Sequence, residues 1–153
     1  MNYQVILYYY FSPVANPGQF CKEHKAFLKE LGVKGRVYIS SEGLNGTIGG
    51  TPEQIEKYKK FVWSLPGFEK TEFKTDHDDR IPFAKLTCKV RDEIVAIHRD
   101  GLNPDDGGTH LSPQEWRNVM EQQDDYVMID VRNNYESRVG HFEGAIKPDV
   151  ENF

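Results

Sequence analysis

The sequence has few cysteines and no long hydrophobic run. Its two cysteines, Cys21 and Cys88, do not form a Cys-x-x-Cys pair. No apolar stretch approaches the roughly 20 residues that cross a bilayer, so we expect no membrane partner. The N-terminal residues 1–4 lack the basic region of a secretory signal. These absences predict a reduced protein of the cytoplasm.

The charge is low overall but unevenly distributed. The 153 residues have a net charge of −5, with 38% hydrophobic and 12% aromatic residues, enough for a real core. Residues 1–100 contain 15 Lys/Arg and 13 Asp/Glu, whereas residues 101–153 contain 4 and 11. The whole chain is therefore no obvious nucleic-acid binder, but its first part could bind nucleic acid locally.

The pattern of residues 1–100 predicts one α+β domain. A β-branched and aromatic run at 3–11 predicts a buried strand, and helical spacing after it predicts a helix that stops at Gly32. Thr51 as a cap with Gln54 as its capping-box partner predicts a second helix. Further strands are expected at 36–39, at 47–48 after a turn at 43–46, near 72–75, at 85–91 and at 94–98. The order β-α-β-β-α-β with a strand extension is ferredoxin-like.

A second region follows a predicted linker. Residues 101–110 are rich in Gly, Asn, Pro and Asp, without apolar periodicity. Ser112 and Pro113 then predict a helix start, and 127–131 predicts a strand. We expect domains at 1–100 and 111–153, joined by that linker.

Three stretches together resemble one family. They are Ser-Glu-Gly-Leu-Asn-Gly-Thr-Ile at 41–48, Lys-Leu-Thr-Cys-Lys-Val-Arg at 85–91 followed by Glu-Ile-Val at 93–95, and a rhodanese-like segment at 126–146. In this order and at this spacing they are similar to the rhodanese-related tRNA uridine hydroxylases of bacteria, the TrhO/YceA type. The resemblance covers nearly the whole chain.

The resemblance implies a fold, an activity and a partner. It implies a ferredoxin-like, acylphosphatase-like domain ahead of a rhodanese domain, of which 111–153 would be an incomplete part. It implies an oxidoreductase that hydroxylates the wobble uridine of tRNA. No acylphosphatase anion loop with its arginine is visible, and the rhodanese cysteine loop would lie beyond Phe153. We therefore assign no catalytic residue and expect this chain alone to be inactive.

A face of the predicted sheet is the main candidate for binding tRNA. Strand alternation places basic and aromatic residues together, opposite the core positions. The candidates are Lys34, Arg36, Lys85, Lys89 and Arg91 for phosphates, with Tyr8, Tyr10 and Tyr38 for stacking bases. The alternative is that these aromatics pack under the linker, the second domain or another subunit.

A second candidate is the stretch that contains Glu42, Asn45 and Gly46. Its backbone N–H groups could hold a phosphate, although it lacks the ending of a nucleotide-binding P-loop. The alternative is a β-turn whose glycines and Asn45 accept positive φ.

The remaining polar residues predict no metal and no cofactor. Cys21 and His24 share a helix face, which suits either an activated thiol or two unrelated side chains, and Cys88 should point into the core. In the rhodanese-like segment, Asp130, Arg132, Glu136 and His141 look structural, because their spacing fits no standard zinc pattern.

Three functions stay open at this point. The first is the N-terminal portion of a tRNA uridine 5-hydroxylase that helps to position tRNA. The second is part of a rhodanese-type sulfurtransferase, which would move a persulfide sulfur to an acceptor. The third is a non-enzymatic module that binds RNA or a protein partner.

Overall fold

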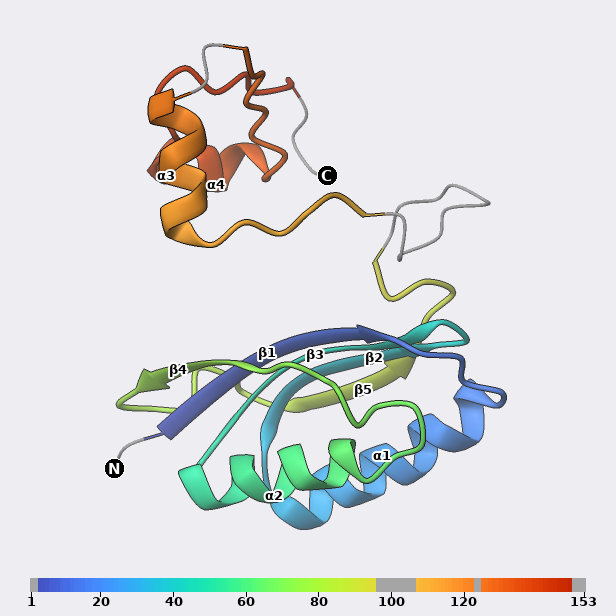
Figure 1. Cartoon of the computed structure of the whole chain (residues 1–153). Helices are drawn as coiled ribbons and strands as arrows, with labels where there is room; N and C mark the ends of the chain where they lie inside the picture. Colours follow the sequence, from blue (N-terminus) through green and yellow to red (C-terminus); the bar gives the residue numbers. More distant parts are fainter. Residues whose placement is uncertain (1–2, 96–106, 123–124, 150–153) are drawn as a thin grey trace. The chain divides into compact units, whose positions relative to one another are not determined.

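The computed structural model describes residues 3–95, 107–122 and 125–149, and the chain forms two compact units (Figure 1). Unit 1 is Met1–Asp106 and unit 2 is Gly107–Phe153. The predicted linker at 101–110 lies mostly outside the described residues.

Unit 1 contains a five-stranded sheet with both helices on one face (Figure 1). The strand order is β4-β1-β3-β2-β5, and only the β2–β5 pair is parallel. The elements are β1 (Tyr3–Phe11), α1 (Pro17–Leu31), β2 (Lys34–Ser40), β3 (Gly43–Gly50), α2 (Pro52–Trp63), β4 (Lys74–Asp78) and β5 (Leu86–Val90). The first six follow the βαββαβ order and β5 extends the sheet beside β2, so the ferredoxin-like prediction is confirmed.

The helix boundaries follow from local chemistry. The side chain of Asn16 accepts a hydrogen bond from Gln19 N at 3.0 Å, and α1 ends at Gly32, whose φ of 76° is left-handed. The predicted capping box of α2 is present: Thr51 N donates to Gln54 Oε1 at 2.8 Å, and Thr51 Oγ1 accepts from Gln54 N at 3.3 Å.

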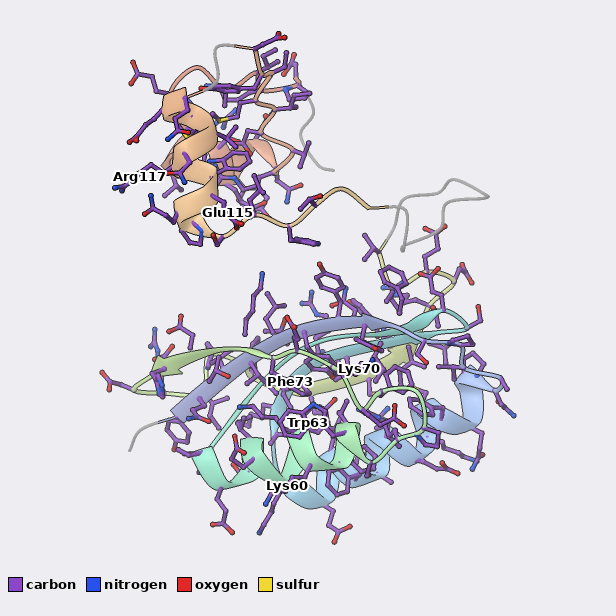
Figure 2. All side chains as sticks on the ribbon, in the orientation of Figure 1. Lys60, Trp63, Lys70, Phe73, Glu115 and Arg117 are labelled. Carbon is purple, nitrogen blue, oxygen red and sulfur yellow. The ribbon has the colours of Figure 1, made fainter. Side chains whose placement is uncertain are left out.

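The core lies between the helices and one face of the sheet. Each strand alternates, so every second residue points to this face. Fully buried members are Ile6, Leu28, Val37, Ile39, Leu44, Ile48, Ile55, Tyr58 and Val62. At the C-terminal end of α2, Trp63 meets Phe73 edge to face with ring centroids 5.5 Å apart, and its indole N–H donates to the carbonyl of Thr71 at 2.9 Å, which fixes the segment before β4 (Figure 2).

The hairpin between β2 and β3 differs from the sequence prediction. The turn is only Ser41–Glu42, and β3 already begins at Gly43. Gly43 has φ of 152°, and a Cβ there would lie 2.1 Å from the Tyr10 carbonyl oxygen, so the glycine serves close strand pairing rather than a turn. The predicted turn at 43–46 is therefore wrong. The strand expected near 72–75 runs instead over β4, and of the run at 94–98 the first two residues form a bend while 96–98 lie outside the described residues.

Unit 2 has two helices and one short strand contact. Helix α3 (Pro113–Gln122) begins where Ser112 and Pro113 predicted, with Glu115 N donating to Ser112 Oγ at 3.3 Å. Helix α4 (Asn134–Val139) follows the segment predicted as a strand. That segment forms a single parallel bridge, Ile129 with Ile146, rather than a longer strand. A pair of strands without further neighbours is only marginally stable.

Candidate nucleic-acid interface

The face of the sheet opposite the helices brings the predicted basic residues together. Strand register places Tyr9, Asn45, Tyr38 and Lys89 in one row across β1, β3, β2 and β5. The next row is Lys74, Leu7, Thr47, Arg36 and Thr87, from β4 to β5. Lys34 lies one row further, opposite Gly49. By alternation Lys85 and Arg91, on either side of β5, belong to the same face.

Two predicted stacking residues lie on the wrong face. Tyr8 is 2% exposed and points toward the helices with Ile6, and Tyr10 packs against Phe68 with ring centroids 5.9 Å apart. The prediction that Tyr8 and Tyr10 are open to bases is therefore wrong. The reason is that β1 is apolar or aromatic at every position from Val5 to Phe11, so this run could not show which alternate set faces the core.

Of the β1 aromatic residues that alternate onto the open face, Tyr3, Tyr9 and Phe11, the most exposed is Tyr9. Its side chain is 54% exposed, beside Leu7 at 46%. The ring of Phe11 meets that of Tyr9 edge to face at 6.4 Å, which orients it. The residues predicted from the sequence did not include Tyr9, Leu7 or Lys74, because the pattern of β1 alone does not show which of its residues face the core.

Tyr38 is held between two arginines. The guanidinium carbon of Arg91 is 5.0 Å from the centre of the Tyr38 ring, and that of Arg36 is 6.0 Å away. Such cation–π contacts restrain both the ring and the guanidinium groups. The acidic residues on the open face lie at the β4 edge, where Asp76 and Asp78 are in register with Val5 and Tyr3. The predicted cations of the open face therefore lie on the β2–β5 half, apart from Lys74, which lies on β4.

The residues of the second candidate site bind the chain itself. The Glu42 carboxylate accepts a hydrogen bond from Ile94 N at 2.7 Å, and Asn45 Nδ2 donates to Ile94 O at 2.7 Å. The N–H of Glu42 donates to Ser40 Oγ at 3.0 Å. The two side chains thus hold both backbone groups of Ile94, which is 4% exposed. We call this arrangement the Ile94 clamp. Its geometry favours a structural role for Glu42 and Asn45 over a phosphate loop.

The open face is bounded at both ends along β3. At one end Ile94 lies above Asn45. At the other, the β4–β5 connection lies against Gly49, where a Cβ would be 3.3 Å from Ile81 and 3.4 Å from Phe83. We call two adjacent rows of this face the open strip: Leu7, Thr47, Arg36 and Thr87, which lie between these ends, and Tyr9, Tyr38 and Lys89, which flank Asn45 at the Ile94 end.

The helix side of the sheet holds a buried chain of polar groups. The hydroxyls of Tyr8 and Tyr58 are hydrogen-bonded, and the Tyr58 hydroxyl is 2.7 Å from His24 Nε2. Burial raises the pKa of both tyrosines and lowers the pKa of His24 to about 4. His24 is therefore neutral near pH 7. Gly46 makes room for this chain, since a Cβ there would lie 2.4 Å from the Tyr8 hydroxyl oxygen.

The two thiols are close and buried. Cys21 Sγ and Cys88 Sγ are 3.5 Å apart, and burial, with the Cys21 hydrogen bond, raises the pKa of Cys88 to about 12. The prediction that Cys88 faces the core is confirmed. The ring nitrogen of His24 that is bonded contacts Tyr58, so the arrangement agrees with the simpler interpretation of two unrelated side chains.

In unit 2, Asp130 organises the rhodanese-like segment. Arg132 donates to both of its carboxylate oxygens, at 2.9 and 2.8 Å, and Ser137 Oγ donates at 2.7 Å. These bonds hold the pKa of Asp130 well below its usual range. Arg132 also donates to the Gly140 carbonyl, while Glu136 accepts from Asn133 N. His141 Nδ1 is 3.0 Å from the Ser137 carbonyl oxygen. These contacts fit the structural roles that the sequence predicted.

The described part of the chain has neither a metal-ligand cluster nor a membrane-spanning helix. Within 3–95, 107–122 and 125–149, no three His, Cys, Asp or Glu residues are grouped as metal ligands would be. None of the helices in the described part of the chain is long and apolar enough to span a membrane.

Comparison with known families decides where the chain belongs. Residues 3–94 match the family described as the UPF0176 acylphosphatase like domain. The chain belongs to this UPF0176 family. The match extends through all five strands of unit 1 and ends at Ile94, the residue held by the clamp. The UPF0176 domain therefore includes the open strip and its boundaries.

Curated relatives extend the similarity into unit 2. The chain is 44% identical to a tRNA uridine(34) hydroxylase of Shouchella clausii, with 99% of the chain and 48% of the relative aligned. Proteins of the same name from Bacillus pumilus and Bacillus licheniformis are 46% and 42% identical over the same shares. The UPF0176 chain thus spans about half the length of the curated relatives it matches.

Solved structures are only distantly similar to this UPF0176 protein. Klebsiella pneumoniae BlrP1 with FMN and cyclic diGMP aligns with TM-score 0.49 and 16% identity, over 60% of this chain and 26% of that one. The BLUF protein BlrB aligns with TM-score 0.48 and 12% identity, over 58% and 70%. These values are too low to support an inference about ligands.

Proposed function

We propose that the chain is the N-terminal portion of a tRNA uridine(34) hydroxylase of the cytoplasm. The observation that supports this most is the identity of 42–46% to curated proteins of that name along nearly the whole chain. Residues 1–100 would be the acylphosphatase-like domain, 101–110 the linker and 111–153 an incomplete rhodanese-like domain.

In this proposal unit 1 positions tRNA through its open face. Lys34, Arg36, Lys85, Lys89 and Arg91 supply positive charge beside Tyr38, on the half of the sheet remote from Asp76 and Asp78. Lysine and arginine side chains attract the phosphate backbone whatever its sequence. The face would thus orient tRNA, while the oxidation chemistry would occur elsewhere in the longer protein.

The exposed apolar side chains of unit 2 support the proposal that 111–153 is an incomplete rhodanese-like domain. Its side chains include exposed Val127 at 73%, Val131 at 62% and Ile146 at 56%, around the single strand bridge. Apolar surface of this kind is normally covered in a finished domain. We infer that the further length present in the relatives supplies strands that cover it.

Nucleoside mass spectrometry separates this function from its alternatives. The gene encoding the chain would be deleted, and total tRNA digested and quantified. Loss of nucleosides with a 5-hydroxyuridine-derived oxygen supports the hydroxylase. Loss of a thiolated nucleoside instead would favour the sulfurtransferase. Unaltered modification, with RNA binding retained by the purified chain, would favour a non-enzymatic module.

A further inference from the structure

We propose that the open strip binds an unpaired stretch of RNA laid across the strands, with one base stacked on Tyr9 and a neighbouring base on the guanidinium of Arg36. The proposal rests on the tRNA contact proposed above. It adds the form of RNA that is recognised and the two side chains that contact bases.

Tyr9 has the properties of a stacking platform. It is half exposed near the C-terminal end of β1, next to exposed Leu7, on a solvated antiparallel face that normally has polar residues. Phe11 meets its ring in an edge-to-face contact, which restrains the orientation of the ring. An aromatic ring on a sheet stacks any base, because every base has a π-face.

Arg36 offers the second platform. Its guanidinium carbon is 6.0 Å from the centre of the Tyr38 ring, and that of Arg91, which follows β5, is 5.0 Å from the same ring centre. A planar guanidinium held in this way can stack on a base and hydrogen-bond a phosphate, which a lysine ammonium cannot do together. Lys89, in register with Tyr38, adds charge for the backbone.

The spacing of the two platforms fits separated bases. Tyr9 is on β1 and Arg36 on β2, with β3 between them. The two residues are also one row apart, and two strand spacings with a two-residue step along the strand amount to about 12 Å. This is more than three times the ~3.4 Å step between stacked bases in a duplex. The strip therefore suits an extended, unstacked strand.

The boundaries of the strip also favour a single strand. Ile94 above Asn45 and Ile81 with Phe83 above Gly49 stand about four residues, or about 13 Å, apart along β3, with Thr47 as the outward-facing β3 residue between them. A nucleotide chain crossing β1, β3, β2 and β5 would run from Leu7 and Tyr9 toward the cations of β2 and β5. The acidic pair Asp76 and Asp78 lies at the opposite edge, and Asp92 with Glu93 lies beyond the end of β5.

The test measures RNA binding by the full 153-residue chain. Fluorescence anisotropy would follow a labelled RNA of about eight nucleotides, which is within the site size of single-strand binders, and the same strand in a duplex. The variants are Tyr9→Leu and Arg36→Lys. Tyr9→Phe keeps the ring, and Tyr135→Leu removes a matched tyrosine, 63% exposed, from unit 2. Thermal unfolding confirms that each variant is folded.

We expect the unpaired RNA to bind more tightly than the duplex. Tyr9→Leu should weaken binding about fivefold to a hundredfold, the range found for loss of one stacked base, while Tyr9→Phe and Tyr135→Leu leave it unchanged. Arg36→Lys should weaken binding several-fold with the same salt dependence, since the charge is kept.

Two other outcomes would overturn the inference in different ways. In the first, RNA binds, but duplex and single strand bind equally, or Tyr9→Leu and Arg36→Lys bind RNA as tightly as the unaltered chain does. The open strip then does not stack bases, while the proposed tRNA contact is unaffected. If neither RNA binds, and Tyr9→Leu changes self-association in analytical ultracentrifugation, the strip is a protein contact, and both this inference and the tRNA contact fail.

Discussion

Gly46 of β3 lies against the phenol of Tyr8 of β1, its partner across the strand pair. A Cβ at position 46 would stand 2.4 Å from the Tyr8 hydroxyl oxygen and 2.5 Å from its ring carbon. The Tyr8 hydroxyl meets Tyr58, which in turn meets His24. Part of the Glu-Gly-Leu-Asn-Gly stretch is thus explained by a buried hydrogen-bond chain between the sheet and both helices.

The first prediction is that Gly46→Ala destabilises unit 1. The new methyl group must displace a fully buried ring, which typically costs about 1–3 kcal/mol of unfolding free energy. Urea unfolding measures the change. Gly18→Ala is the control, because its Cβ would meet only the Asn16 side chain at 3.6 Å, in the first turn of α1. Equal stability of the two variants would contradict the contact.

The second prediction concerns pH. Burial lowers the pKa of His24 from 6.5 to about 4, so the folded protein holds the neutral ring. Below pH 6.5 His24 is protonated in the unfolded chain, whereas in the folded chain it stays neutral down to about pH 4. The unfolding free energy should therefore fall through this window by about 3 kcal/mol, and level off below it.

The matched variant for this test is His24→Gln, which can still bond Tyr58 but does not titrate. Chemical unfolding of both proteins between pH 7 and pH 5 isolates the histidine, because the carboxylates titrate mostly below this range. Parallel stability curves for the two proteins would show that His24 does not cause the acid sensitivity.

The third prediction concerns the Ile94 clamp. Replacing Glu42 by Ala leaves the buried N–H of Ile94 without its acceptor, a loss of about 1–3 kcal/mol. Hydrogen exchange should show faster exchange of the Ile94 amide, with little change in β1. Glu72→Ala, at an exposed position, is the control. An unchanged exchange rate of the Ile94 amide, together with weaker phosphate binding by the variant, would instead support the predicted phosphate-binding loop at Glu42.

The fourth prediction is that both thiols are unreactive in the native chain. Cys21 and Cys88 are 8% and 4% exposed, and the pKa of Cys88 is raised to about 12, so little thiolate forms. Alkylation at neutral pH, followed by mass spectrometry, should label neither cysteine until denaturant is added. Rapid native labelling of Cys21, slowed in His24→Gln, would instead indicate an activated thiol.

The sequence predicted most of the fold because its local signals were strong. The Thr51–Gln54 capping box, the Gly32 stop and the alternation around Cys88 each have a mechanism that acts within a few residues. The orientation of β1 could not be predicted in this way. Tyr8, Tyr9 and Tyr10 are equally suited to either face, and only pairing with Gly46 decides which ring is buried. Likewise, the hydrogen bond between Ile94 N and the Glu42 carboxylate joins residues 52 positions apart, so no local pattern predicts it.

The most direct test of the account is a salt titration of tRNA binding by the 153-residue chain. Arg36→Glu/Lys89→Glu reverses two charges on the open face. Lys22→Glu/Lys60→Glu makes the same change in net charge on α1 and α2, and Figure 2 shows Lys60 on the helix layer. We predict that only the first pair weakens binding, and that it reduces the slope of log affinity against log salt by about two. Equal affinities for the two double variants at every salt concentration would contradict the placement of tRNA on the open face.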